Sequence, residues 1–336
     1  MSGTARFLRS SLTSVAGPLA ALLLAVVVVS LTTDRFMMER NLSNVSLQVS
    51  TVAIAAIGST LVILTGGIDL SPGAAVALTS CTLAILTKNQ HIPVVVSIPM
   101  TLGLGIVLGF VNGFFSTYGR IPSFVVTLAT MSVYRGLANL FTEGHPIFSV
   151  SPDLDTVFYG RFLGFPLPLC YVVVLYLIML VFLRLTLPGR AIYAVGGNES
   201  AARLSGIHVN RTRLLAFVLA GLMAAIAGVL TTARLDSGSP HYGVGTELQA
   251  IAAAVIGGAS LTGGHGNIIA TLFGALTVAV VQNGLNLNAV QSSWQDITIG
   301  AIIVLAVGID MWRTVISQRV AQLVPLFKRF LTSILH

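Results

Sequence analysis

Leu64-Thr65-Gly66-Gly67-Ile68-Asp69-Leu70-Ser71-Pro72-Gly73 separates two apolar runs of the chain, at roughly 45–65 and 72–87. Glycine and proline interrupt helices, whereas the two runs have the composition of helices that cross a lipid bilayer. The second run is shorter than the about 20 residues that a full crossing needs. The stretch therefore predicts a break between one complete membrane helix and a short or re-entrant one.

A similar stretch recurs 191 positions later in the chain, again between two apolar segments. Gly66, Gly67, Leu70 and Gly73 correspond to Gly257, Gly258, Leu261 and Gly264, and Ser71 corresponds to Thr262. Paired helix breaks in the two halves of a chain are typical of transporter folds with internal repeats. We therefore expect helix-break or pathway roles for Gly66, Gly67, Asp69, Ser71, Gly73, Gly257, Gly258 and Gly264.

The composition of the whole chain agrees with residence in a membrane. Of its 336 residues, 55% are hydrophobic and 9% are charged, whereas soluble domains carry about 25% charged residues. So few charges do not cover a water-facing surface of this size. The composition excludes a soluble enzyme, a disordered protein and a nucleic-acid binder.

Apolar segments that resemble membrane spans recur along the chain. They lie at roughly 15–33, 45–65, 72–87, 93–118, 122–141, 166–187, 212–233, 246–260, 267–286 and 294–312. The third and the eighth are short, so eight to ten crossings are expected. The predicted fold class is all-α: a polytopic membrane helix bundle of about ten transmembrane helices, two of them short or broken.

The charged residues predict how the bundle is oriented. With ten spans and a cytoplasmic start, the inside segments hold twelve positive charges and three acids, and the outside segments hold six and eight. Lysine and arginine accumulate on the cytoplasmic side of membrane proteins. Both termini are therefore expected in the cytoplasm, and the net charge of +7 indicates topology and lipid contact.

Several kinds of active site are missing from the sequence. Neither of the two lysines, Lys88 and Lys328, follows a glycine, so no nucleotide-binding P-loop exists. The six histidines lack metal-ligand spacing, and Cys81 and Cys170 lie in apolar runs, as small buried residues do. We expect no catalytic residue, no metal site and no directly bound cofactor.

Polar side chains within the spans are candidates for lining a transport path. They are Asn112, Thr127, Arg135, Asn139, Gln249 and Asn283. Hydrogen bonding between helices explains buried amides equally well, and Arg135 could instead reach outward to the membrane surface. Asp69, Asp296 and Asp310 lie near span ends, which weakens the alternative of an ion-coupled carrier working alone.

The longest inside loop, from Pro188 to Ile207, predicts a turn followed by a short helix. Asn198 suits the N-cap position, and Glu199 complements the positive end of the helix dipole. Gly206 suits the left-handed conformation that follows the last helical turn.

This short helix is a candidate docking element for a soluble partner, although an ordinary surface loop is the alternative. Ala201, Ala202 and Leu204 would form a small apolar surface that arginines flank. The predicted docking residues are Gly196, Gly197, Asn198, Glu199, Ala201, Ala202, Arg203, Leu204, Ser205 and Gly206.

Four blocks of the chain resemble permease subunits of sugar-importing ABC transporters of the ribose, xylose, galactose and autoinducer type. The blocks are Thr65 to Gly73, Ile121 to Leu128 with Tyr134-Arg135-Gly136, Ala194 to Ile207, and Ala254 to Gly264. They occur in the family's order and span about residues 40 to 312. A permease for branched-chain amino acids, which are carried by more distant relatives, is a second alternative.

The resemblance implies a division of labour between several subunits. Such permeases pair as homodimers or heterodimers in the bacterial inner membrane and form the translocation path between them. A cytoplasmic ABC ATPase docks on the short helix and hydrolyses ATP, in agreement with the missing P-loop. A periplasmic sugar-binding protein docks on the outer side, where the loop at 142–165 would contribute.

Two parts of the chain are predicted: a transmembrane permease domain at 1–312, with its family-like core at about 40–312, and a C-terminal tail at 313–336. In the tail, Ile316, Val320 and Leu323 recur at three- and four-residue spacing among basic residues. This pattern predicts an amphipathic helix on the inner leaflet of the membrane.

Overall fold

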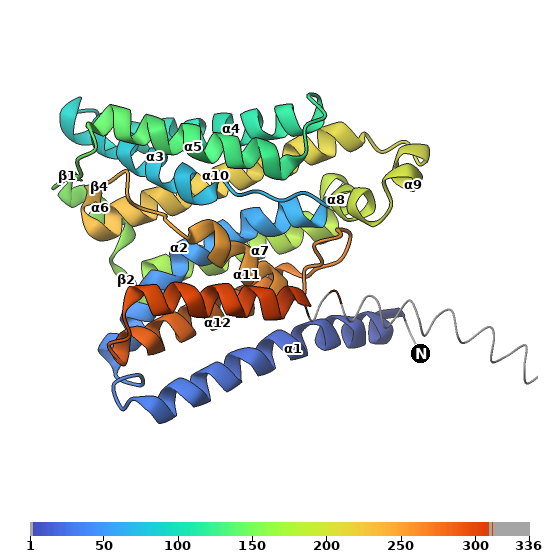
Figure 1. The fold of residues 1–336 in the computed structure, drawn as a ribbon, viewed down its shortest axis with the longest axis horizontal. Coiled ribbons are helices and arrows are strands. Elements are labelled where there is room, and N and C mark those ends of the chain that lie inside the picture. Colours follow the sequence, from blue (N-terminus) through green and yellow to red (C-terminus); the bar gives the residue numbers. More distant parts are fainter. Residues whose placement is uncertain (1–2, 309–310, 312–336) are drawn as a thin grey trace, which may run out of the picture.

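The computed structural model describes residues 3–308 and 311, and these form a bundle of long helices that run along one direction (Figure 1). The helices are α1 (Gly3–Thr32), α2 (Glu39–Leu64), α3 (Pro72–Ala84), the π-helical turn η1 (Ile85–Asn89), α4 (Val94–Thr117), α5 (Ser123–Thr142), α6 (Pro152–Phe158), α7 (Leu167–Leu185), α8 (Leu187–Gly197), α9 (Glu199–Leu204), α10 (Val209–Leu235), α11 (Thr246–Ile256) and α12 (Ile268–Leu287). A further apolar helix, Ser292–Gly308, follows α12. The predicted tail at 313–336 lies outside the described residues.

Four two-residue strands lie in the connections between helices. The strand β1 (Ile147–Phe148) pairs antiparallel with β4 (Ser237–Gly238), with Ile147 opposite Gly238. The strand β2 (Arg161–Phe162) pairs antiparallel with β3 (Phe165–Pro166). The β1–β4 ladder ties the loop after α5 to the segment after α10, whereas β2 and β3 form a local hairpin before α7.

The helix count agrees with the prediction from apolar runs. In the described part of the chain, seven helices are long and apolar enough to cross a membrane: α1, α2, α4, α5, α7, α10 and α12. The α11 helix has 11 residues, too few to cross an apolar layer of about 30 Å at about 1.5 Å per residue. The α3 helix has 13 residues and continues directly into the π-helical turn η1. The third and eighth predicted spans are therefore short, as expected.

The two ends of the bundle differ in structure and charge. The α8 and α9 helices lie at the end where α1 begins, whereas α6, β1 and β4 lie at the opposite end (Figure 1). The end with α8 and α9, here called the basic end, carries Arg120, Arg184, Arg190, Arg203, Arg211 and Arg213. The basic end therefore has the charge pattern of a cytoplasmic face.

The core is built around α2 and α10, which pack against each other and against several further helices. Small residues bring α4 and α10 close together. A Cβ atom added to Gly105 or Gly109 on α4 would collide with the backbone of α10, and one added to Gly221 would collide with α4. In lipid, burying apolar side chains between two helices gains no hydrophobic free energy, because the lipid tails are apolar as well. Close approach of the backbones stabilises the helix pair there through van der Waals packing.

The structure corrects the prediction for the first part of the inside loop. Residues 188–197, predicted as a turn, belong to α8, and the helix buries Ile192 and Val195. The Thr186 side chain caps it by accepting a hydrogen bond from the Gly189 amide at 3.1 Å. Proline is favourable in the first turn of a helix. Pro188 therefore lies in the first turn of α8 and does not mark a loop turn.

Candidate functional site

Three segments from distant parts of the chain meet at the basic end, and we call their contact the glycine junction (Leu64–Gly67, Gly196–Gly197 and Gly263–Gly264). The Gly264 amide donates a hydrogen bond to the Leu64 carbonyl at 2.9 Å. Gly66, Gly263 and Gly264 have φ angles of +79°, +88° and +73°, which residues with a side chain rarely adopt. Both predicted glycine-rich breaks therefore contact each other and the end of α8.

Gly196 is the most tightly enclosed residue of the glycine junction. A Cβ atom on Gly196 would collide with the carbonyl oxygen of Leu64 and the amide nitrogen of Gly264. A Cβ atom on Gly197 would reach only the Gly264 Cα atom, at 4.0 Å. The junction is thus a contact between backbones, and it joins α2, α8 and the loop after α11.

The other predicted break residues lie in two places. Gly257 ends α11 and packs against the backbone of Thr271 on α12, whereas Gly258 has a φ of +80° and leads the chain out of α11. Asp69, Ser71 and Gly73 lie at the other end of the first break, directly before and within the start of α3.

The short helix α9 has the caps that the sequence predicts. The Asn198 side chain accepts a hydrogen bond from the Ala201 amide at 2.9 Å. Gly206 follows the helix with a φ of +82°, as a C-terminal glycine does. The prediction of a short capped helix at this position is confirmed.

Two ion pairs stabilise α9, one within the helix and one that joins it to α10. The Arg203 guanidinium lies 3.0 Å from one carboxylate oxygen of Glu199, and the Arg213 guanidinium of α10 lies 2.8 Å from the other. The hydrogen bond from Arg203, together with the charge of Arg213, lowers the pKa of Glu199. Glu199 is therefore ionised at neutral pH and joins the two arginines.

The exposed surface of α9 differs from the predicted one in a single residue. Ala202 is only 4% exposed, because it packs against Val195 of α8 and Val209 of α10. Ala201 is exposed, and Leu204 is 90% exposed. The apolar surface available to a partner is therefore formed by Ala201 and Leu204. Ala202 instead packs α9 against α8 and α10.

Asp69 and Ser71 begin a chain of buried hydrogen bonds that joins the first break to α4 and α5. One Asp69 carboxylate oxygen accepts hydrogen bonds from the Ser71 amide at 2.8 Å and from the Ser71 hydroxyl at 2.7 Å. The Asn112 side-chain amide donates to the Ser71 hydroxyl at 2.7 Å. Thr130 and Tyr134 of α5 donate to the Asn112 side-chain oxygen at 2.6 and 3.2 Å.

Side chains of α5 also satisfy the extended backbone of this break. The Thr127 hydroxyl accepts a hydrogen bond from the Leu70 amide at 3.0 Å, and the Ser123 hydroxyl accepts one from the Ile68 amide at 3.0 Å. Non-helical backbone inside a membrane protein needs such partners, because no water is available there. Thr127 and Asn112, two of the predicted path residues, are buried supports of the break.

The α3 and α11 helices meet at their N-terminal ends. A Cβ atom on Gly73 would collide with the Gly243 carbonyl oxygen and with a Glu247 carboxylate oxygen, and one on Gly243 would collide with the Gly73 backbone. Short helices whose N-termini face each other are the building blocks of transporter centres.

Arg135 of α5 binds the segment that leads into α11. Its guanidinium donates hydrogen bonds to the carbonyls of Pro240 and Tyr242 at 2.6 and 2.7 Å. The side chain is half-buried and points at protein backbone, so it does not reach outward to the membrane surface. Arg135 therefore fixes the approach of the two short helices.

The remaining predicted path residues lie apart from this centre. Asn283 of α12 and Asn41 of α2 exchange two buried amide hydrogen bonds, at 2.9 and 3.0 Å. The Asn139 side chain donates to the Arg135 carbonyl of its own helix at 2.9 Å, and Gln249 is half-buried on α11. For Asn283, the interhelical hydrogen bond expected as the alternative is what the structure shows.

Sequence reasoning missed Glu247, Thr130 and Ser123 as members of the site. Glu247 lies in the first turn of α11 and has a buried carboxylate oxygen without a hydrogen-bond partner among the described residues. Its position inside the short predicted span at 246–260 was the available signal. Thr130 and Ser123 carried no signal of their own, because hydroxyl side chains are common in membrane helices.

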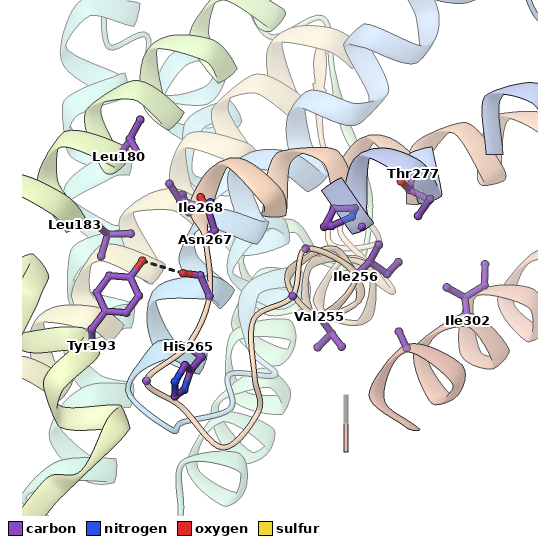
Figure 2. A pocket seen from close by; sticks show the side chains of 18 of the residues that line it. Leu180, Leu183, Tyr193, Val255, Ile256, His265, Asn267, Ile268, Thr277 and Ile302 are labelled. Carbon is purple, nitrogen blue, oxygen red and sulfur yellow. Dashed lines mark hydrogen bonds between the residues drawn. The ribbon is translucent and has the colours of Figure 1, made fainter. Parts of the chain in front are cut away.

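A large cavity opens on another side of the basic end, between α1, α7, α8, α12 and the helix Ser292–Gly308 (Figure 2). Its volume is about 1760 Å³, and Leu180, Leu183, Val255, Ile256 and Ile302 line it. The Tyr193 hydroxyl donates to the Gly266 carbonyl at 3.2 Å on one wall. Mostly apolar walls suit hydrocarbon better than a polar solute.

Metal-binding chemistry finds no support in the part of the chain that the structure describes. No group of three or more histidine, cysteine, aspartate or glutamate side chains lies close enough to hold a metal ion there. Cys81 is buried and Cys170 half-buried, and both are free thiols.

Comparison with known proteins identifies a family over most of the chain. Residues 41–307 match the family described as "Branched-chain amino acid transport system / permease component". The ribose import permease proteins RbsC of Bacillus subtilis and of Escherichia coli K12 are each 43% identical to this chain, over 304 and 296 residues. These alignments cover 88% and 87% of this chain and 92% of each relative.

A xylose permease is also similar to the chain. The xylose transport system permease protein XylH of Haemophilus influenzae is 33% identical over 355 aligned positions, which cover 86% of this chain and 95% of the relative. No solved structure matches the chain significantly.

Proposed function

Since this chain belongs to the permease family of sugar-importing ABC transporters, we propose that it forms the translocation path for a monosaccharide and is driven by a separate cytoplasmic ATPase. The relatives are named for the import of ribose and xylose, which supports a small sugar as the solute. The description of the matching family names branched-chain amino-acid transport, so an amino-acid permease is the second candidate. The ion-coupled carrier has no comparable support.

The exposed face of α9 carries the proposal for the ATPase. Leu204 is 90% exposed on a helix that is capped at both ends and joined to α10 by the Glu199–Arg213 ion pair. An apolar side chain presented on a rigid element is a suitable anchor for a protein partner. ATP would bind only to that partner, and its binding and hydrolysis would act on this chain only by moving α9.

The glycine junction supplies the mechanical link in this proposal. Because α8 ends at Gly196 against the Leu64 carbonyl, a displacement of α8 and α9 pushes on the end of α2 and on the loop after α11. The first of these segments leads into α3, and the second follows α11. The ATPase would thereby move the two short helices, whose N-terminal ends meet, and would switch the path between the two sides.

We place the path itself between two copies of the chain, along α5. This helix is the least apolar of the seven long helices, and only 22% of its apolar window is buried. Ala129, Ser132 and Gly136 lie on that exposed surface, which contact with lipid alone does not explain. A second permease subunit would cover this surface. A periplasmic sugar-binding protein would deliver the sugar at the end opposite to α9. The basic end would then face the cytoplasm, and the chain would lie in the inner membrane of a bacterium.

A reconstitution experiment tests this function. The permease, its ATPase and its sugar-binding protein are placed in vesicles, and uptake of labelled ribose and xylose is measured with and without ATP. We expect uptake only with all three proteins and ATP. Uptake by the permease alone in an ion gradient would refute the proposal.

A substitution at α9 makes the test specific. We expect Leu204→Asp to abolish both ATPase binding and uptake, because a charge replaces the apolar anchor. For ATPase binding, Leu163→Asp is the matched control, since Leu163 is 83% exposed in the loop between β2 and β3 at the opposite end. Equal ATPase binding by both variants would contradict the assignment of α9.

A further inference from the structure

A polar pocket lies beside α9, and we call it the arginine pocket. It is lined by Thr65, Gly66, Gly67, Ser116, Thr117, Arg120, Ile121, Pro122, Ser123, Glu199, Arg203, Arg213 and Phe217 and has a volume of about 500 Å³. Five segments contribute: the first helix break, the end of α4, the loop before α5, α9 and the start of α10. The pocket is separate from the apolar cavity of Figure 2 and shares no residue with it.

The charges of the arginine pocket favour an anion. Arg120, Arg203 and Arg213 line it, and Glu199 is the single acid in the lining. Both oxygens of Glu199 are already engaged, one by Arg203 and one by Arg213. An arginine guanidinium has five N–H donors in a fork that matches a second carboxylate, so the two arginines retain donors for one.

Unpaired hydroxyl groups give an independent indication of a ligand. The Ser116 and Thr117 hydroxyl oxygens are buried and have no hydrogen-bond partner among the described residues. Thr117 is only 8% exposed. Buried polar groups are normally satisfied, and a hydroxyl that lines a basic pocket is suited to donate to an anion held there.

The position of the pocket indicates where the anion comes from. Arg203 lies in α9 directly before Leu204, the exposed apolar anchor, and its side chain is largely exposed. A protein that docks on Leu204 therefore lies within reach of the arginine pocket. Such a partner can insert one of its own side chains as it binds.

We propose that the arginine pocket receives an acidic side chain of the cytoplasmic ATPase subunit, which binds Arg203 and Arg213 next to Glu199 and accepts hydrogen bonds from Ser116 and Thr117. This inference rests on the proposed function and names the chemistry of the partner's surface. The inserted carboxylate touches the end of α4 and the helix break at Thr65–Gly67, so it connects the ATPase to the first break directly.

Binding measurements with neutral variants test the proposal. Purified permease in lipid nanodiscs is titrated with its purified ATPase at low and at high salt. We expect Arg203→Gln and Thr117→Val each to weaken binding by about tenfold at low salt, because each removes a donor to a desolvated carboxylate. The Arg203→Gln variant should also lose most of the salt dependence.

A matched control separates this effect from a general loss of positive charge. Arg211 is exposed at the start of α10 and does not line the pocket. Arg211→Gln should change the affinity by less than about twofold. Equal weakening by Arg211→Gln and Arg203→Gln would overturn the proposal, and thermal unfolding of every variant shows whether it is folded.

A double-mutant cycle identifies the inserted residue. Acidic residues on the ATPase surface are changed one at a time to asparagine or glutamine. One of them should weaken binding to the wild-type permease but not to Arg203→Gln, because the two changes remove the same contact. If no acidic residue couples to Arg203, the proposal is wrong.

The outcomes remain distinct from those of the proposed function. If the wild-type permease does not bind the ATPase at all, the function itself fails. If Leu204→Asp abolishes binding while Arg203→Gln and Thr117→Val bind like wild type, only the arginine pocket is refuted. Inorganic phosphate that stabilises the wild type but not Arg203→Gln, with no coupled acid on the ATPase, would show a small-anion site instead.

Discussion

At Gly196 the absence of one methyl group determines whether three segments of the chain can touch. The residue lies against the Leu64 carbonyl and the Gly264 amide, and its neighbour Gly197 has open space. Two adjacent glycines therefore have different roles, although the sequence presents them as a pair. The difference depends only on the direction in which each Cα hydrogen points.

This difference leads to a prediction at the residue scale. Gly196→Ala should destabilise the protein by about 1–3 kcal/mol, because the added Cβ atom overpacks a contact made of backbone, which cannot rotate away. Gly197→Ala is the matched control and should leave stability within about 0.5 kcal/mol of the wild type. Thermal unfolding in detergent measures both, and equal unfolding temperatures for the two variants would contradict the account of the junction.

At the scale of elements, the two short helices depend on a single arginine. Arg135 binds the carbonyls of Pro240 and Tyr242 and so holds the segment between β4 and α11 against α5. An arginine can bind two carbonyls with one planar group, whereas a lysine ammonium is a point charge. The chemistry of the guanidinium, beyond its charge, is needed at this position.

We therefore predict that Arg135→Lys loosens the segment at 239–245 while the charge is kept. The loss of one charge-assisted hydrogen bond should destabilise this segment by about 1.5–3 kcal/mol, visible as faster amide hydrogen exchange there. Arg161→Lys serves as the control, because Arg161 forms only an exposed ion pair with Glu39 at 3.6 Å. Unchanged exchange at 239–245 in Arg135→Lys would show that other contacts hold the segment.

The elements also show how far sequence patterns reach. The long apolar runs and the short helix after Asn198 were predictable, because apolar length and capping are local properties. The burial of Ala202 was not, since it depends on Val195 and Val209 from neighbouring helices. Nor was the pairing of the glycine breaks, because the bond from Gly264 to Leu64 joins residues far apart in the chain.

At the scale of the whole molecule, the charge difference between the two ends predicts the orientation in the membrane. Ser205 is exposed just after α9 at the basic end, and Leu163 is exposed at the other end. In a variant without Cys81 and Cys170, a membrane-impermeant maleimide should label Ser205→Cys only in inside-out vesicles. It should label Leu163→Cys in right-side-out spheroplasts, and the reverse pattern would show that the basic end faces outward.

The contacts at the two ends of α2 have a consequence for how the protein is made. Asn41 pairs with Asn283, which is 242 residues further along the chain, and Leu64 pairs with Gly264. At translation rates of about 5–20 residues per second, α2 emerges roughly 10–50 s before its partner on α12. The most buried long helix is thus among the earliest synthesised and completes its contacts late. A ribosome that stops before residue 264 releases a chain that lacks both of these contacts of the central helix.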